Sequence, residues 1–324
     1  MSVAEKVFAE GVAKEIKNYL PPEYAGMECQ VMEQRKNNGV LLTGIYFKMP
    51  GQQMSPLVYT GPFYEAVRHG EPLNEIMGAL AHTVEKSMEV KKLSGFSHPY
   101  EYETVKDYLT VQLVNTKANQ RQLSDMPHRE IEDLSLTLAL RFPMPEAEGN
   151  GSIKVTQKLV SQWGVSEQAL YQQAWENMEK EQTPVLQSME TVAEDILTGT
   201  DSKENFLSEG DMPERSPMEM MYVMSNKEKT YGAAVLSCPG VMEKVSRLFP
   251  EGFYILPSSV HEVLIVPKEQ GISPKDLGQM VREVNRAEVA REEVLSDRVY
   301  EYDKEAQKIR QVPESIERAR GMER

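Results

Sequence analysis

The sequence has few cysteines and no long apolar run. Cys29 and Cys238 are its only two cysteines in 324 residues, a count that argues against a disulfide framework and fits a reducing compartment. No stretch approaches the ~18 consecutive apolar residues that a membrane span needs. Residues 1–20 intersperse Glu and Lys with apolar side chains, where a signal peptide would have a continuous apolar core. We therefore expect a cytoplasmic protein without a membrane segment.

The common motifs of catalysis and cofactor binding are also missing. The chain has no GxxxxGK[ST] phosphate loop, no GxGxxG, no HExxH or CxxC metal spacing and no GxSxG elbow. The sequence therefore predicts no cofactor and no zinc site. It contains no recognisable catalytic motif, and whether the chain is an enzyme stays open.

Basic residues are outnumbered by acidic ones. There are 36 Lys and Arg against 50 Asp and Glu, a formal net charge of −14. Nucleic-acid binding depends mainly on Lys and Arg that neutralise phosphates, so we expect no nucleic-acid partner. A nucleic-acid mimic would need its acids aligned on one face, whereas this sequence intersperses acids and bases.

Periodicity in the first part of the chain predicts helices around a small sheet. Apolar residues at helical spacing predict a helix over 3–19, which Pro21-Pro22 ends. Alternating residues on either side of Asn38-Gly39 predict a β-hairpin at 27–48, because Asn-Gly adopts the positive φ angles of a type I′ turn. A short strand at 57–59 and a helix from Pro72 follow.

The rest of the chain repeats strands and helices. Residues 133–140 alternate and predict a half-buried strand, and Ser166 predicts a helix N-cap. Further strands are expected at 220–224, 231–236, 253–256 and 263–266, with helices opening at Pro239 and at Ser273-Pro274.

These elements predict an α+β fold with mixed sheets and packed helices in two units. The first is an N-terminal α+β unit at 1–128, and the second is a C-terminal α/β unit at 129–303. Residues 198–217 contain Gly, Pro and acids but few apolar groups, which predicts a mobile loop. Residues 304–324 are expected to fray.

Several short fragments resemble a known family when they are taken in order. They are Lys36 to Val40, Ser55 to Tyr59, Leu113 to Asn115 with Asn119, Leu123 and Pro127, Asp133-Leu134, Leu256 to Ser259, and Ser296 to Tyr300. Together they resemble domain-of-unknown-function family 5688, found in anaerobic gut bacteria, over residues 5 to 305. The resemblance implies a bacterial protein. That family has no established activity, so no functional residue is carried over.

Two groups of residues have the chemistry of metal ligands. Asp125, His128, Glu130, Glu132 and Asp133 lie within nine residues, and His82 and Glu85 share one face of a helix. A solvated turn explains the first group and a surface pair explains the second. We therefore predict no metal site.

Two further places have the chemistry of nucleophiles. Ser258, Ser259 and His261 contain a hydroxyl and a base, but neighbours two apart along a strand rarely meet, and a turn between two strands explains them. Cys238 precedes Pro239, which favours the N1 position of a helix. An N-cap cysteine would gain from the helix dipole as a thiolate. The competing interpretation is a buried, inert thiol in a tight turn.

The sequence thus leaves three classes of function open. A soluble binding or interaction protein is favoured, because helix and sheet surface is present without a catalytic set. A protein partner would suit the 19 methionines, which form adaptable interfaces. The alternatives are an enzyme of unrecognised type with Cys238 as a reactive thiol, and an acidic nucleic-acid mimic. The oligomeric state is left open.

Overall fold

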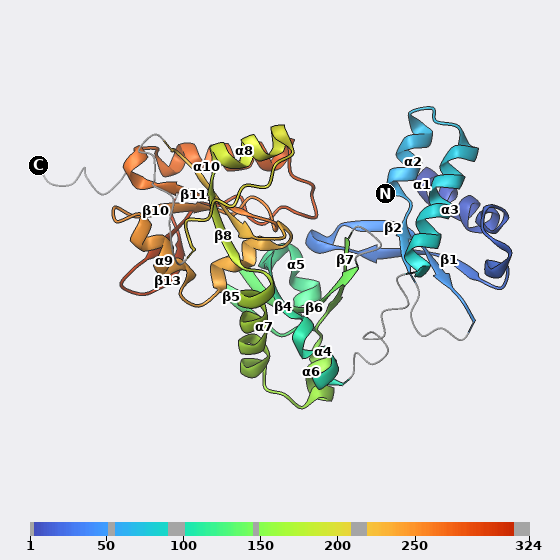
Figure 1. The fold of residues 1–324 in the computed structure, drawn as a ribbon, viewed down its shortest axis with the longest axis horizontal. Coiled ribbons are helices and arrows are strands. Elements are labelled where there is room, and N and C mark those ends of the chain that lie inside the picture. Colours follow the sequence, from blue (N-terminus) through green and yellow to red (C-terminus); the bar gives the residue numbers. More distant parts are fainter. Residues whose placement is uncertain (1–2, 51–55, 90–100, 145–148, 209–218, 314–324) are drawn as a thin grey trace, which may run out of the picture. The chain divides into compact units, whose positions relative to one another are not determined.

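The computed structural model describes residues 3–50, 56–89, 101–144, 149–208 and 219–313. It confirms the predicted α+β class, because three antiparallel sheets carry packed helices. The chain divides into a first unit of residues 1–105 and 141–152 and a second unit of residues 106–140 and 153–324 (Figure 1).

The expected boundary at residue 128 falls inside the second unit. Residue 128 begins strand β5 (His128–Ile131), which lies in the same sheet as β4 (Leu109–Asn115) and β6 (Leu134–Met144). Strand β6 pairs with both β4 and β5. These pairings group residues on either side of position 128, so a division there would split one sheet.

The first unit contains the predicted hairpin. Strands β1 (Glu28–Arg35) and β2 (Leu41–Lys48) are antiparallel, and β2 also pairs with β3 (Leu57–Tyr59). Asn38 and Gly39 have φ angles of 56° and 72°, the left-handed conformations that this turn requires. The hairpin prediction is confirmed.

Helices cover this sheet and complete its core. They are α1 (Val3–Glu15), which continues into a 3-10 turn at Ile16–Tyr19, α2 (Gly61–Arg68) and α3 (Leu73–Glu89), and the short α4 (Tyr102–Val105) belongs to the same unit. Ile16, Ile45, Phe47, Leu80 and Val84 are fully buried in one cluster. Leu80 and Val84 lie about one turn apart on the same face of α3, and Ile45 and Phe47 lie on the same face of β2. Both faces therefore point into the same core.

In the second unit, residues 134–140 of β6 form the central strand of a sheet with the order β4-β6-β5. Strand β7 (Gly149–Lys154) also pairs with β6, and residues 141–152, which span the end of β6 and most of β7, are grouped with the first unit. The neighbouring helices are α5 (Thr116–Leu123), α6 (Gln157–Trp163) and α7 (Glu167–Glu181). Ser166 caps α7 as predicted, accepting a hydrogen bond from the Ala169 N–H at 3.3 Å. Strand β6 is buried on both faces from residue 134 to 142, so the expected half-buried strand is wrong. Both alternating sets of side chains are covered by other parts of the chain, and this cover depends on tertiary packing.

A second, six-stranded sheet has the order β13-β12-β10-β11-β9-β8. Its strands are β8 (Pro184–Ser188), β9 (Tyr222–Asn226), β10 (Phe253–Leu256), β11 (Val263–Pro267), β12 (Tyr300–Asp303) and β13 (Lys308–Gln311), and its helices are α8 (Met189–Thr198), α9 (Val241–Leu248) and α10 (Pro274–Ala287). Leu256 shares a cluster with Leu277 of α10, whereas Phe253 meets Phe249, just beyond α9, at 5.9 Å. Since adjacent residues alternate across a strand, α9 and α10 cover opposite faces.

The strand expected at 231–236 is wrong. Gly232–Ser237 form a 3-10 helix (η8). Tyr231 has a φ of 53°, which interrupts an extended chain. Both edges of β9 are already paired, with β8 and with β11, so no edge is left for a further strand.

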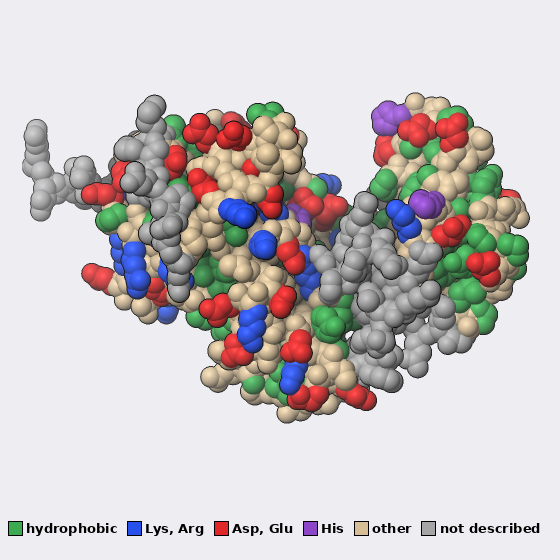
Figure 2. Space-filling view, viewed as in Figure 1, with side chains coloured by type: hydrophobic (Ala, Val, Ile, Leu, Met, Phe, Trp, Pro, Cys, Tyr) green, Lys and Arg blue, Asp and Glu red, His purple; other side chains and the backbone are tan. Residues whose placement is uncertain are grey.

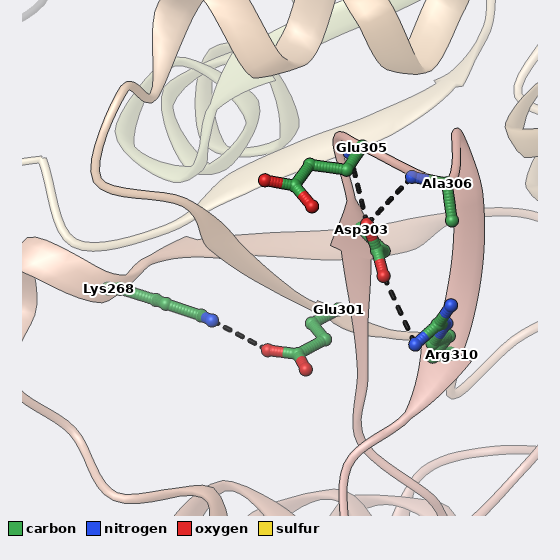
Figure 3. Close-up of polar contacts among 6 residues, drawn as sticks. All are labelled: Lys268, Glu301, Asp303, Glu305, Ala306 and Arg310. Atoms are coloured by element: carbon green, nitrogen blue, oxygen red, sulfur yellow. Dashed lines mark hydrogen bonds and ion pairs between the residues drawn. The ribbon is translucent and has the colours of Figure 1, made fainter.

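The end of the described chain forms a hairpin where fraying was expected. Residues 308–311 of the expected tail are β13, paired with β12. Figure 3 shows that Asp303 organises the turn between them. It accepts hydrogen bonds from the N–H groups of Glu305 and Ala306 at 3.0 and 2.9 Å, and its other oxygen pairs with Arg310 at 3.1 Å. On the same sheet, Lys268 pairs with Glu301 at 2.6 Å.

The predicted loop at 198–217 begins with an anchored segment. Phe206 and Leu207 are buried. The Asp195 carboxylate of α8 accepts hydrogen bonds from the Thr200 hydroxyl and the Ser202 N–H. Residues 209–217 lie outside the described residues, and the mobility of the loop stays a prediction.

Across the described ranges, no helix combines the length and the apolar character needed to cross a bilayer.

Candidate functional site

The second unit contains a polar cavity beside the carboxylate of Asp133. Five residues line this cavity of 420 Å³, which we call the Asp133 pocket: Asn115, Asp133, Arg282, Asp297 and Arg298. The residues come from the end of β4, the start of β6, the middle of α10 and the turn before β12. All of them carry a charged or amide side chain. The volume falls within the 300–1,000 Å³ of small-molecule sites, whose walls are usually more apolar than these.

Asp133 is held by donors from three parts of the chain. Its Oδ1 accepts hydrogen bonds from the Tyr300 hydroxyl and from Gln311 Nε2, the latter at 2.9 Å. Its Oδ2 accepts from the Ser296 hydroxyl at 3.1 Å. An ionised carboxylate has about four acceptor positions, so three internal donors leave room for about one more.

The Tyr300 hydroxyl is a permanent donor to this carboxylate. Burial raises the pKa of Tyr300 well above its ordinary value, and the hydrogen bond to Asp133 raises that pKa further. Ionised Tyr300 would place two negative oxygens against each other. The hydroxyl therefore keeps its proton over the whole physiological pH range, and it orients Asp133 throughout.

Local structure explains how Asn115 and Asp133 meet. Asn115 ends β4 and caps α5, where its Oδ1 accepts from the Ala118 N–H at 3.0 Å. Asp133 follows Glu132, whose φ of 57° turns the chain from β5 into β6. The Thr116 N–H then donates to the Asp133 carbonyl at 2.9 Å. Two turns at the same end of one sheet thus place these side chains together.

Asn285 of α10 orders the opposite wall of the pocket. Its Nδ2 donates to the Ser296 carbonyl at 3.1 Å and to Asp297 Oδ1 at 2.8 Å. The residue is 7% exposed, and its Oδ1 is buried with no hydrogen-bond partner among the described residues. Such an orphaned acceptor costs about 1–3 kcal/mol. Asn285 itself does not line the Asp133 pocket, and its effect there is to hold Asp297.

A smaller cavity of 170 Å³ shares three wall residues with the Asp133 pocket, namely Arg282, Asp297 and Arg298. Lys275 and Gly278 of α10 line it further, together with the apolar residues Pro274, Val299, Val312 and Pro313. The smaller cavity therefore has three cationic side chains and one carboxylate. The Asp133 pocket has two cationic side chains and two carboxylates.

The structure overturns the interpretation of Cys238 as a helix N-cap. Gly240, with a φ of 76°, is the N-cap of α9, whereas Cys238 ends the preceding 3-10 helix. The thiol is buried, and burial together with a smaller contribution from the nearby Glu179 raises the pKa of Cys238 to about 12. A protonated, enclosed thiol is a poor nucleophile. The N-cap placement on which the reactive-thiol hypothesis rested is therefore wrong, and burial of the thiol argues against its reactivity.

Ser259 and His261 are neighbours, but their hydrogen bonds do not suit nucleophilic catalysis. Nδ1 of His261 accepts from the Tyr231 N–H at 3.2 Å, and Nε2 faces Glu293 at 3.4 Å. The Ser259 oxygen accepts from the His261 backbone N–H at 3.0 Å. Because both ring nitrogens have other partners, the imidazole is not placed to take a proton from Ser259. A structured turn accounts for these residues, as the sequence favoured.

The two groups of potential metal ligands do not converge. In the part of the chain that the structure describes, no three His, Cys, Asp or Glu side chains are placed to hold one ion. Within the first group, Asp133 turns toward Tyr300 and Gln311, while Nδ1 of His128 lies 2.9 Å from the Met126 carbonyl.

Sequence reasoning missed the Asp133 pocket as a site. Asn115, Asp133 and the run 296–300 all occur in the fragments that resemble the known family, and the structure brings them together. A fourth such fragment adjoins them, because the Ser296 N–H donates to the Pro257 carbonyl at 2.9 Å. The order of the fragments was the available signal. Arg282 had no sequence signal that marked it as a site residue, because it is one of many charged residues on an amphipathic helix.

Charge on the second unit is mixed. The visible face in Figure 2 shows Asp and Glu interspersed with Lys and Arg over this unit. A nucleic-acid mimic needs rows of negative charge, and this face does not provide them.

Comparison with known proteins gives one result. A family model described as a family of unknown function, DUF5688, matches residues 5–304. No curated protein matches the chain, and no solved structure does.

Proposed function

The chain belongs to the DUF5688 family, and from that premise we propose that it is a soluble binding protein whose ligand is a small polar molecule held in the Asp133 pocket. The observation that carries the proposal is the convergence of Asn115, Asp133, Arg282, Asp297 and Arg298 around one cavity of 420 Å³.

Charge and hydrogen-bonding capacity support binding at this place. Each guanidinium has five N–H donors in a rigid fork, so an arginine bonded within the protein still has donors for a ligand. Asp133 is oriented in advance by Tyr300, Ser296 and Gln311. A site whose polar groups are already ordered binds at a lower entropic cost.

The test is a thermal-shift screen of the full chain against a panel of small polar metabolites. A ligand at about ten times its Kd stabilises the folded state by about 1.4 kcal/mol, which raises the Tm of a domain of this size by about 2–5 °C. Arg282→Ala should abolish the shift. Arg286→Ala is the matched control, because Arg286 is an exposed arginine on the same helix that lies outside both cavity walls.

Ligands that stabilise the native chain and Arg286→Ala equally, but not Arg282→Ala, support the proposal. A panel in which every stabilising ligand acts equally on Arg282→Ala would overturn it.

A further inference from the structure

The two cavities share a wall but differ in chemistry at their unshared ends. Arg282, Asp297 and Arg298 are common to both. Beyond this shared wall, the smaller cavity adds Lys275, and the Asp133 pocket adds Asp133 and Asn115. One end is thus cationic and the other carries a carboxylate and an amide.

We propose that the two cavities bind opposite ends of one zwitterionic small molecule, with its anionic group at Lys275, Arg282 and Arg298 and its ammonium group at Asp133. This inference rests on the proposed function and specifies the class of ligand. The anionic group is a carboxylate or a phosphate, since both accept hydrogen bonds from an arginine fork.

The cationic end has the composition of an anion site. Three cationic side chains and one carboxylate line the smaller cavity. The planar fork of an arginine matches the geometry of carboxylate and phosphate groups. Val299 and Val312 form apolar wall beside these charges and are 5% and 9% exposed. Apolar walls lower the local dielectric, which strengthens attraction between the protein and a bound anion.

The acidic end can accept an ammonium group. Asp133 uses three of about four acceptor positions internally, and Asp297 supplies a second carboxylate in the same wall. An ammonium has three donors, so it can bond to more than one of these oxygens. Among the lining residues, Asp133 carries the one charge at the unshared end of this pocket, so an ammonium group is attracted there and an anionic group is repelled.

The experiment is calorimetric titration of the full chain with matched probes. 4-Aminobutanoate carries both charges, butanoate only the anion, and butylamine only the cation. Glycine and 6-aminohexanoate vary the separation of the charges, and phosphoethanolamine replaces the carboxylate with phosphate. The native chain should bind the best-fitting zwitterion at least about ten-fold more tightly than either single-charge probe, since one added charge-assisted contact contributes about that factor.

Two variants test which residue binds the ammonium group of the ligand and which binds its anionic group. In Asp133→Asn, the affinity ratio of 4-aminobutanoate to butanoate should fall toward one. In Arg282→Ala, the ratio of 4-aminobutanoate to butylamine should fall toward one, while Arg286→Ala leaves both ratios unchanged. A ratio of two probes on the same variant does not depend on how much of that variant is folded.

The outcomes separate this inference from the proposed function. If an anion binds through Arg282 but no zwitterion binds more tightly, the site stands and the ligand class is wrong. The same holds if only other ligands of the metabolite panel bind in an Arg282-dependent way. If no ligand of either panel depends on Arg282, both proposals fail. A preference for phosphoethanolamine over every amino acid identifies phosphate as the anion.

Discussion

The hydroxyl of Tyr300 donates a hydrogen bond to Oδ1 of Asp133, which lies 167 residues away in the sequence. Through this bond, β12 holds the carboxylate of the residue that precedes β6. The same carboxylate receives Gln311 from β13. One acidic side chain therefore links the two sheets of the second unit.

Tyr300→Phe should lower the free energy of unfolding by about 1.5–3 kcal/mol, because it removes a donor to a charged acceptor. Tyr254→Phe is the control on the adjacent strand β10, where the side chain is more exposed and its hydroxyl has no hydrogen-bond partner among the described residues, and it should cost less than half as much. Urea unfolding followed by tryptophan fluorescence reports on the second unit, since Trp163 and Trp175 both belong to it. Equal losses in the two variants would show that Asp133 gains no stability from Tyr300.

Asp303 should make the β12–β13 hairpin sensitive to acid. The hydrogen bond from the Ala306 N–H lowers the pKa of Asp303 below its ordinary value, and Arg310 and the Glu305 N–H lower it further, against a smaller opposing effect of desolvation. The folded state therefore favours the charged form. Its stabilising contribution is complete above the ordinary carboxyl pKa and is lost as pH falls through the lowered pKa.

The measurement is the difference in unfolding free energy between the native chain and Asp303→Asn as a function of pH. The difference should be constant from neutral pH to about pH 5 and should shrink below about pH 4. A difference for Asp303→Asn that grows on acidification contradicts the assignment.

Cys238 should react more slowly than Cys29 in the native chain. Burial raises the pKa of both thiols, but Cys238 is buried and its pKa is raised to about 12, whereas Cys29 is half-buried with Lys17 lowering its pKa in part. Alkylation with iodoacetamide at pH 8, resolved by peptide mass spectrometry, should label Cys29 first. In denaturant the two rates should become equal. Faster native labelling of Cys238 would restore the reactive-thiol hypothesis.

Gly232→Ala should destabilise the second unit by about 1–3 kcal/mol, the usual cost of overpacking a tight site. An added Cβ would overlap the Ser225 hydroxyl and lie 2.6 Å from the Asn226 nitrogen and from the His261 carbonyl oxygen. Gly11→Ala in α1 is the contrast, because no neighbouring heavy atom lies within 4 Å of its added Cβ. That change should stabilise its helix by about 0.5–1 kcal/mol. Calorimetric Tm values compare the two, and a neutral Gly232→Ala would contradict the tight packing around η8.

Local sequence determined the elements whose conformation depends on a few neighbouring residues. The Asn38-Gly39 turn and the caps at Ser166 and Ser273 were readable, because a turn or a cap is set by the φ angles and side chains of about four residues. The strands at 253–256 and 263–266 were readable for the same reason, since their apolar side chains alternate over a short span.

Tertiary structure decided the candidate site and the fate of the cysteine. Asn115, Asp133 and Arg282 come from three separate parts of the chain, and only the packing of two sheets and α10 places them around one cavity, with Tyr300 bonded to Asp133. Cys238 looked activated because Pro239 suggested a helix start, but the positive φ of Gly240 moved that start two residues along the chain and the core enclosed the thiol. Burial and long-range contact depend on the whole chain, and a pattern of neighbouring residues does not contain them.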